Sequence, residues 1–135
     1  MKVGITFLAF EFLHSGYIQM LEEAKKQCDY LIVGLNTNPK IETELPLSKD
    51  YTLIERYISL KACKYVDEII PYQSEQDLED IIRSFKIDIR FLGPEYKKKN
   101  YTAKEYCQNK GVEIYFNKRD LRPKKVWLLK NKTTI

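Results

Sequence analysis

Apolar runs of strand length alternate with amphipathic segments of helix length along this chain. The run 30–35 (YLIVGL) is continuously apolar, which is typical of a strand buried on both faces of a parallel sheet. By contrast, Leu78, Ile82 and Phe85 recur at helical spacing, which predicts a helix that turns this face inward. In the same way, the pattern predicts strands at 2–7, 30–35, 68–71, 89–92 and 112–116 and helices at 15–27, 51–64, 75–85 and 102–110.

Strands and helices therefore alternate about five times, which predicts an α/β domain of Rossmann-like type, with a parallel sheet covered by helices on both faces. Ligands of such sheets bind beyond the carboxyl ends of the strands, where the strand order reverses. The stretch 36–50 has little periodicity, and we interpret it as a long loop of the kind that often carries function. The pattern indicates one domain over 1–117, followed by a basic segment at 118–135.

Composition narrows the class of protein. Hydrophobic residues make up 44% of the chain, which is a globular composition, and no run approaches the roughly 18 apolar residues that cross a bilayer. Three cysteines lie far apart and there is one histidine, so the sequence predicts no metal site and a cytoplasmic location. Seven basic residues and one acidic residue lie in 117–135, and this stretch either is solvated or contacts phosphates. Nucleic-acid binding is the least supported alternative, because no RNP, KH or helix-turn-helix pattern is present.

The junction between the first strand and the first helix carries the most informative chemistry. His14, the only histidine, and Gly16 stand where the strand pattern gives way to a helical one. A helix N-terminus offers unpaired backbone N–H groups and the positive end of the helix dipole, so it suits a phosphate. The alternative is that His14 only caps the helix. Other polar residues that follow predicted strands, or begin the helix after the long loop, are Glu11, Lys40, Arg56, Gly93, Glu95, 97–99 and Arg119.

Two blocks of the sequence resemble the glycerol-3-phosphate cytidylyltransferase group of small nucleotidyltransferases. That family has a GTFD-like turn and LLHxGH before its first helix, and this chain has LAFEFLHSGY at 8–17. The family's arginine-containing helix leads to YVDEVIP, and here Arg56 leads to KYVDEIIP. A later family turn, MGDDW or a variant, corresponds to LGPEY at 92–96. The resemblance covers residues 1–117 and implies a nucleotidyltransferase-like fold.

The resemblance also implies a reaction. The phosphate of a small alcohol or sugar attacks the α-phosphorus of CTP, or of another nucleoside triphosphate, and pyrophosphate leaves. An Mg²⁺ ion accompanies the triphosphate, and the family is usually homodimeric. His14 and Tyr17 stand where the family has its two histidines, so they are the implied catalytic pair. The residues implied to bind the nucleotide or its phosphates are Ala9, Phe10, Glu11, Gly16, Lys40, Lys49, Arg56, Gly93, Glu95 and Arg119.

The chain departs from the family pattern at several positions. Tyr17 replaces the second histidine, and its phenol donates a hydrogen bond but carries no positive charge at neutral pH. Leu8 and Ala9 replace the small Gly and Thr of the family's turn. The family's RTxxISTT segment is absent, and NKRDLRPKKVW stands in its place. The alternative function is therefore a catalytically impaired family member that binds a nucleotide or serves as an assembly module.

Overall fold

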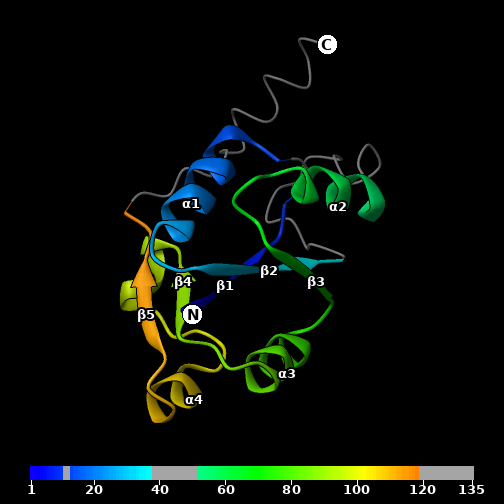
Figure 1. The fold of residues 1–135 in the computed structure, drawn as a ribbon. Helices are drawn as coiled ribbons and strands as arrows, with labels where there is room; N and C mark the ends of the chain where they lie inside the picture. Colours follow the sequence, from blue (N-terminus) through cyan, green and yellow to red (C-terminus); the bar gives the residue numbers. More distant parts are fainter. Residues whose placement is uncertain (11–12, 38–51, 119–135) are drawn as a thin grey trace.

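The computed structural model describes residues 1–10, 13–37 and 52–118 (Figure 1). Strands and helices alternate along these ranges, as the sequence predicts. The elements are β1 Val3–Leu8, α1 Ser15–Lys25, β2 Tyr30–Asn36, α2 Leu53–Lys61, β3 Glu68–Tyr72, α3 Glu75–Ser84, β4 Ile89–Leu92, the 3-10 helix η1 Pro94–Lys98, α4 Lys104–Asn109 and β5 Glu113–Phe116.

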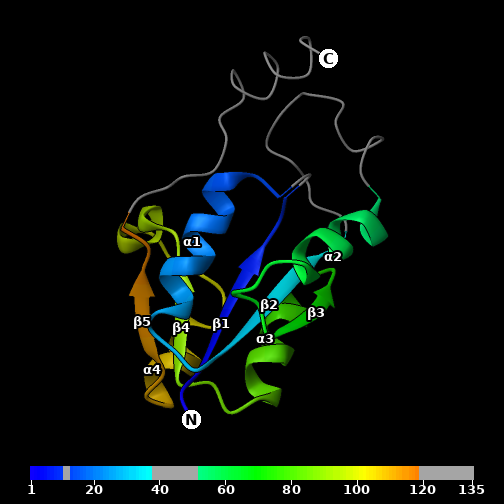
Figure 2. The same ribbon diagram turned by 45° about the horizontal axis from the view of Figure 1, so that its top comes forward.

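The five strands form one sheet in the order β3-β2-β1-β4-β5, and every pair of neighbours is parallel. Helices α1 and α2 cover one face of the sheet, and α3 and α4 cover the other (Figures 1 and 2). The predicted Rossmann-like α/β fold is confirmed. The strand order reverses between β1 and β4, so this architecture places the expected ligand site at the carboxyl ends of those two strands.

Each face of the sheet has its own apolar core. Leu21 and Ala24 of α1 and Leu60 of α2 pack with β1, β2 and β4 on one side. On the other side Ile82 of α3 packs with Cys107 of α4. The helices α2 and α3 each begin with a capping box, in which a serine or threonine and an acidic residue exchange hydrogen bonds with backbone N–H groups.

Helical spacing alone did not identify which apolar residues face the core. Ile18, which shares a helical face with Leu21 in the sequence pattern, is 36% exposed. Ile54 and Ile58 are 70% and 60% exposed, because α2 turns Arg56 and Leu60 inward instead. The helix η1 was not predicted, and most of the interpreted loop at 36–50 lies outside the described residues.

Two local contacts bear on the site. Gly34 of β2 pairs with Phe7 of β1, and a Cβ on Gly34 would lie 2.3 Å from the Phe7 ring. Only glycine therefore leaves room for that ring at its present position.

Near the end of the described chain, the Glu23 carboxylate of α1 accepts hydrogen bonds from the Tyr115 hydroxyl at 2.9 Å and from the Asn117 amide at 3.2 Å. This carboxylate ties the end of β5 to α1.

Candidate active site

A pocket of about 380 Å³ lies at the carboxyl ends of β1 and β4. Its position matches the switch point in strand order, where parallel α/β sheets bind ligands. One wall comes from β1 and α1, and the other comes from the α3 side of the sheet and the segment that follows η1. Its lining residues include Ala9, Tyr17, Asn36, Tyr72, Glu75, Arg90, Gly93, Glu95, Asn100, Tyr101, Thr102 and Asn117. Apolar side chains, among them Phe7, Leu8 and Met20, line it as well, so the pocket offers both polar and apolar surface to a ligand.

His14 is the N-cap of α1. Its backbone is extended, and its Nδ1 accepts a hydrogen bond of 2.9 Å from the Gly16 N–H. A neutral imidazole that accepts at Nδ1 carries its hydrogen on Nε2, so this contact fixes the tautomer. The capping role that the sequence left open is therefore present. His14 is half-buried and is not among the residues that line the pocket.

Tyr17 and Ala9 bring the first strand and the first helix to the pocket wall. Tyr17 is 7% exposed and belongs to the apolar core, where its ring lies 5.6 Å from that of Phe10. Phe10 is 2% exposed and Gly16 is buried, and neither lines the pocket. The Phe10 side chain packs in the core and Gly16 has no side chain, so any role of these two residues in nucleotide binding falls to their backbone groups.

Arg56 occupies a different place from the pocket. Arg56 is 6% exposed, and its guanidinium donates to the backbone carbonyls of Asn36 at 2.7 Å and Thr37 at 3.0 Å. These carbonyls lie at the carboxyl end of β2, next to the segment that leads into the long loop. Arg56 therefore fixes the backbone at the end of β2, and Asn36 in turn lines the pocket. Direct contact between Arg56 and a phosphate stays a prediction.

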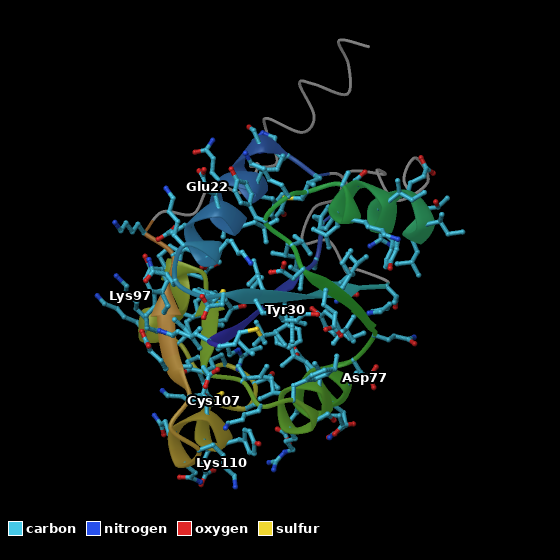
Figure 3. The ribbon with its side chains drawn as sticks, in the orientation of Figure 1. Glu22, Tyr30, Asp77, Lys97, Cys107 and Lys110 are labelled. Carbon is cyan, nitrogen blue, oxygen red and sulfur yellow. The ribbon has the colours of Figure 1, made fainter. Side chains whose placement is uncertain are left out.

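Gly93 and Glu95 lie at the pocket, at the turn after β4. Gly93 precedes η1, and a Cβ on it would lie 2.0 Å from Oε1 of Glu95. The Glu95 carboxylate thus lies over the Gly93 backbone, and a larger residue at 93 would displace it. Lys97 of η1 is exposed and extends outward from the molecule (Figure 3).

Four of the residues implied by the family resemblance, Glu11, Lys40, Lys49 and Arg119, lie outside the described residues. At this carboxyl edge, where the sequence predicts several cations, Arg90 is the only cationic residue among the described residues that line the pocket. The carboxylates of Glu75 and Glu95 line the pocket with it. The edge described here is mixed in charge rather than uniformly basic.

Arg90 is the residue that the sequence reasoning missed. It lies in β4 and lines the pocket, and only 3% of it is exposed. The signal was a single charged residue inside the short strand IRFL, which is buried at every position. Burial lowers the pKa of Arg90 below its ordinary value, and the nearby Cys107 partly opposes that change.

The phenols of Tyr72 and Tyr101 face the same pocket. Burial raises the pKa of both side chains above the ordinary tyrosine value. Both phenols therefore stay protonated at neutral pH and can donate hydrogen bonds to a ligand. They give the α3 side of the pocket two neutral donors next to the positive charge of Arg90.

Within residues 1–10, 13–37 and 52–118, no group of three or more His, Cys, Asp or Glu side chains is placed to hold a metal ion. An Mg²⁺ ion held by these residues would therefore take most of its ligands from phosphate oxygens and water. Within the same ranges, no helix has the length and apolar character needed to span a membrane.

Comparisons with known proteins agree with this geometry. A family model described as Cytidylyltransferase-like matches residues 9–132. Glycerol-3-phosphate cytidylyltransferase from Bacillus subtilis is 36% identical over 111 residues, which cover 80% of this chain and 83% of that protein. Bifunctional protein HldE from Hyphomonas neptunium is 30% identical over 115 residues, which cover 84% of this chain and 24% of that protein.

One solved structure extends the comparison to the fold. The lipopolysaccharide core biosynthesis protein from Thermoplasma volcanium superposes with a TM-score of 0.60 at 23% identity, and the match covers 86% of this chain and 93% of that one. At this identity the likeness concerns the fold alone. It supports the same nucleotidyltransferase-like arrangement of strands and helices that the sequence blocks imply.

Proposed function

This chain belongs to the cytidylyltransferase-like family, and from that premise we propose that it transfers CMP from CTP to a small phosphorylated alcohol or sugar. An oxygen of the acceptor phosphate attacks the α-phosphorus of CTP and forms a new P–O bond. The bond from the α-phosphorus to the bridging oxygen of the β-phosphate breaks, and pyrophosphate leaves with the electron pair. The observation that carries the proposal is the pocket at the switch point between β1 and β4.

The chain's own residues would assist this transfer by positioning and by stabilising charge. His14 holds its Nε2–H as a donor because Nδ1 is engaged by Gly16, and we assign that donor to the phosphates of CTP. Tyr17 contributes a second, neutral donor at the pocket wall. An Mg²⁺ ion bound with the triphosphate would supply further neutralisation of its charge. The nucleotide-binding roles of the remaining residues named from the family resemblance stay predictions.

The sharpest test separates the two roles of His14. Asparagine is among the best N-cap residues, so His14→Asn keeps the cap but removes the imidazole donor. We expect H14N to unfold with the free energy of the parent protein and to lose about 10²–10³ in turnover, the usual cost of removing one donor to a transition-state charge. His14→Ala is the comparison that loses both roles.

The assay follows pyrophosphate release from CTP and Mg²⁺ with a panel of alcohol and sugar phosphates, and it is repeated with ATP. Pyrophosphate release that depends on the acceptor phosphate and that falls strongly in H14N supports the proposal. Equal turnover in H14N and the parent protein contradicts the role of His14. No release with any acceptor and either nucleotide contradicts the transferase function.

One observation favours the alternative of a catalytically impaired member. Tyr17 stands in place of the second family histidine and lies in the apolar core against Phe10, so it brings a neutral hydroxyl to the site. In that case the pocket binds CTP without chemistry. Calorimetry with CTP would then report tight binding while the pyrophosphate assay stays at its background.

We also propose that the chain is a homodimer, as the resemblance to the glycerol-3-phosphate cytidylyltransferase group implies. The molecular mass in solution tests this directly, because light scattering coupled to gel filtration distinguishes one 16.1 kDa chain from two. A monomer at the concentration of the activity assay would contradict the proposal.

A further inference from the structure

Arg90 points its guanidinium toward the carboxyl edge of the sheet. In the register of the sheet Arg90 pairs with Ile5 of β1, but its guanidinium carbon lies 5.6 Å from the centre of the Phe7 ring. Phe7 is two residues closer to the carboxyl end of β1. The side chain therefore leans from the middle of β4 toward the pocket that it lines.

None of the contacts that Arg90 makes with the described residues brings a carboxylate into an ion pair with its guanidinium. Its Nη1 donates to the Thr102 carbonyl, and the Tyr101 ring lies 5.2 Å from the guanidinium carbon. Its buried Nε has no hydrogen-bond partner in the part of the chain that is described. Glu75 lies close enough to influence the charge, but no carboxylate of the described residues forms an ion pair with Arg90.

A buried, uncompensated charge is costly, and proteins usually pair such charges. The Thr102 carbonyl, the Cys107 thiol and the Tyr101 ring satisfy Arg90 only in part, because none of these groups carries a full negative charge. An anionic ligand in the pocket would supply the missing partner. The guanidinium is planar and carries several N–H donors, which suits it to an oxyanion, although Nη1 is engaged by Thr102 and Nε is buried.

The surroundings of Arg90 indicate the kind of anion. Tyr72, Asn100 and Thr102 line the same pocket, and they suit a ligand with several hydroxyl groups, although the Thr102 hydroxyl already donates to Oε2 of Glu75 at 3.2 Å. The carboxylates of Glu75 and Glu95 also line it, and they can accept hydrogen bonds from such hydroxyls. A phosphorylated polyol meets both requirements, because its phosphate matches the arginine and its hydroxyls match the remaining groups.

We propose that Arg90 binds the phosphate of the acceptor and is a specificity-determining residue of the pocket. This inference rests on the proposed function, because it assigns one part of the acceptor to one residue. A phosphate held by the guanidinium keeps an oxygen with which to attack the α-phosphorus of CTP from the same pocket. The triphosphate itself is assigned to the His14 side of the site, so loss of Arg90 leaves CTP binding in place.

The test measures binding directly and does not depend on turnover. Calorimetry determines the dissociation constants of inorganic phosphate, glycerol 3-phosphate and CTP for the parent protein, Arg90→Met and Arg90→Lys. Hydrogen bonds to charged groups contribute about 1.5–3 kcal/mol, so we expect R90M to bind glycerol 3-phosphate about 10- to 100-fold more weakly. R90K keeps the charge without the planar pair of donors, and we expect an intermediate loss. CTP binding should change less than about twofold, well under the 1.4 kcal/mol that a tenfold change represents.

Arg83→Met is the matched control, because Arg83 also lies against a tyrosine ring, with its guanidinium carbon 4.5 Å from the ring centre of Tyr106. It pairs with Glu79 and lies outside the pocket of Arg90. R83M should bind phosphate, glycerol 3-phosphate and CTP as the parent protein does. Equal weakening in R83M and R90M would overturn the assignment, because it would report a general effect of charge.

Thermal unfolding supplies a second readout that a merely structural arginine would not produce. Arg90→Met removes a costly buried charge but also the hydrogen bond to the Thr102 carbonyl, so the phosphate-dependent rise in melting temperature decides the question, and the melting temperature without ligand serves as its baseline. Inorganic phosphate at millimolar concentration should raise the melting temperature of the parent protein but not that of R90M. A lower melting temperature of R90M together with unchanged phosphate binding would assign Arg90 to structure alone.

The remaining outcomes distinguish this inference from the proposed function. Phosphate binding that R90M abolishes supports the inference even where no pyrophosphate is released, in which case only the transferase proposal fails. Weakened CTP binding in R90M with unchanged glycerol 3-phosphate binding would place the nucleotide's phosphates at Arg90 and overturn the inference. No binding of either phosphate probe to the parent protein, with or without CTP, would overturn it as well.

Discussion

The two hydrogen bonds from Arg56 to the end of β2 make a sharp test of the site's construction. Arg56→Met removes both donors and keeps an apolar side chain of similar length, and Arg56→Lys retains one donor group with the charge. The bonds that are lost run to the carbonyls of Asn36 at 2.7 Å and Thr37 at 3.0 Å. Because Arg56 is only 6% exposed, solvent screening of these bonds is small.

The expected magnitude follows from the number and kind of bonds. A hydrogen bond to a charged group contributes about 1.5–3 kcal/mol, but Asn36 and Thr37 are half-buried, and water can replace part of what is lost. We therefore expect Arg56→Met to lower the free energy of unfolding by about 2–4 kcal/mol and Arg56→Lys by about half as much. A loss of this size is a large fraction of the roughly 5–15 kcal/mol that stabilises an ordinary domain.

Urea denaturation followed by far-ultraviolet circular dichroism measures this loss, with the slope of the transition checked for constancy. Lys61→Met is the matched control, because Lys61 is an exposed cation on the same helix, and it should change stability by less than about 0.5 kcal/mol. An equally small change in Arg56→Met would refute the reasoning. If that variant instead lost CTP affinity at unchanged stability, Arg56 would act on the triphosphate, as the family resemblance implies.

Three further predictions follow from local geometry. Gly34→Ala places a Cβ 2.3 Å from the Phe7 ring, so we expect a loss of about 1–3 kcal/mol in chemical denaturation, and no measurable loss would contradict the close approach. Ala103 has a φ of 66°, so Ala103→Gly should stabilise the protein by about 0.5–1 kcal/mol, and destabilisation would show that its methyl group matters more than its backbone. Burial raises the pKa of Asp67, but hydrogen bonds from Lys25 and a backbone N–H outweigh it, and the net pKa is lowered. A carboxyl whose pKa is lower in the folded state stabilises the protein at pH values above its unfolded pKa of about 3.9, and this stabilisation is lost as the pH falls through the folded pKa. Asp67→Asn should therefore flatten the acid side of the plot of unfolding free energy against pH. An unchanged plot would refute the assignment.

The centre of the sheet was predictable from sequence because β2 and β4 are buried on both faces. The run YLIVGL and the four-residue strand at 89–92 have no other place in a domain of this size than the middle of a parallel sheet. Helix orientation was harder to predict. Ile54 and Ile58 satisfy helical spacing as well as any buried pair, yet α2 turns Arg56 inward, because two backbone carbonyls at the end of β2 are there to receive it.

The candidate site was predictable only in part. The sequence located the His14 junction and the turn at Gly93, since both follow the ends of strands that pattern identifies. It could not show that the His14 ring turns back to the Gly16 N–H, because a cap and a phosphate ligand have the same sequence signature. Arg90 was not predicted, because the candidate residues were those that follow strand ends. This arginine reaches the pocket from inside β4.

The order of strands has a consequence for how the protein is made. During synthesis β1 first acquires β2 as a neighbour, and its other edge stays uncovered until residue 92 has been produced. The pocket then still lacks Asn117, which follows β5. A nascent chain therefore cannot hold substrate until almost the whole described domain has left the ribosome, and in the interval the open edge of β1 is a surface on which a chaperone can act.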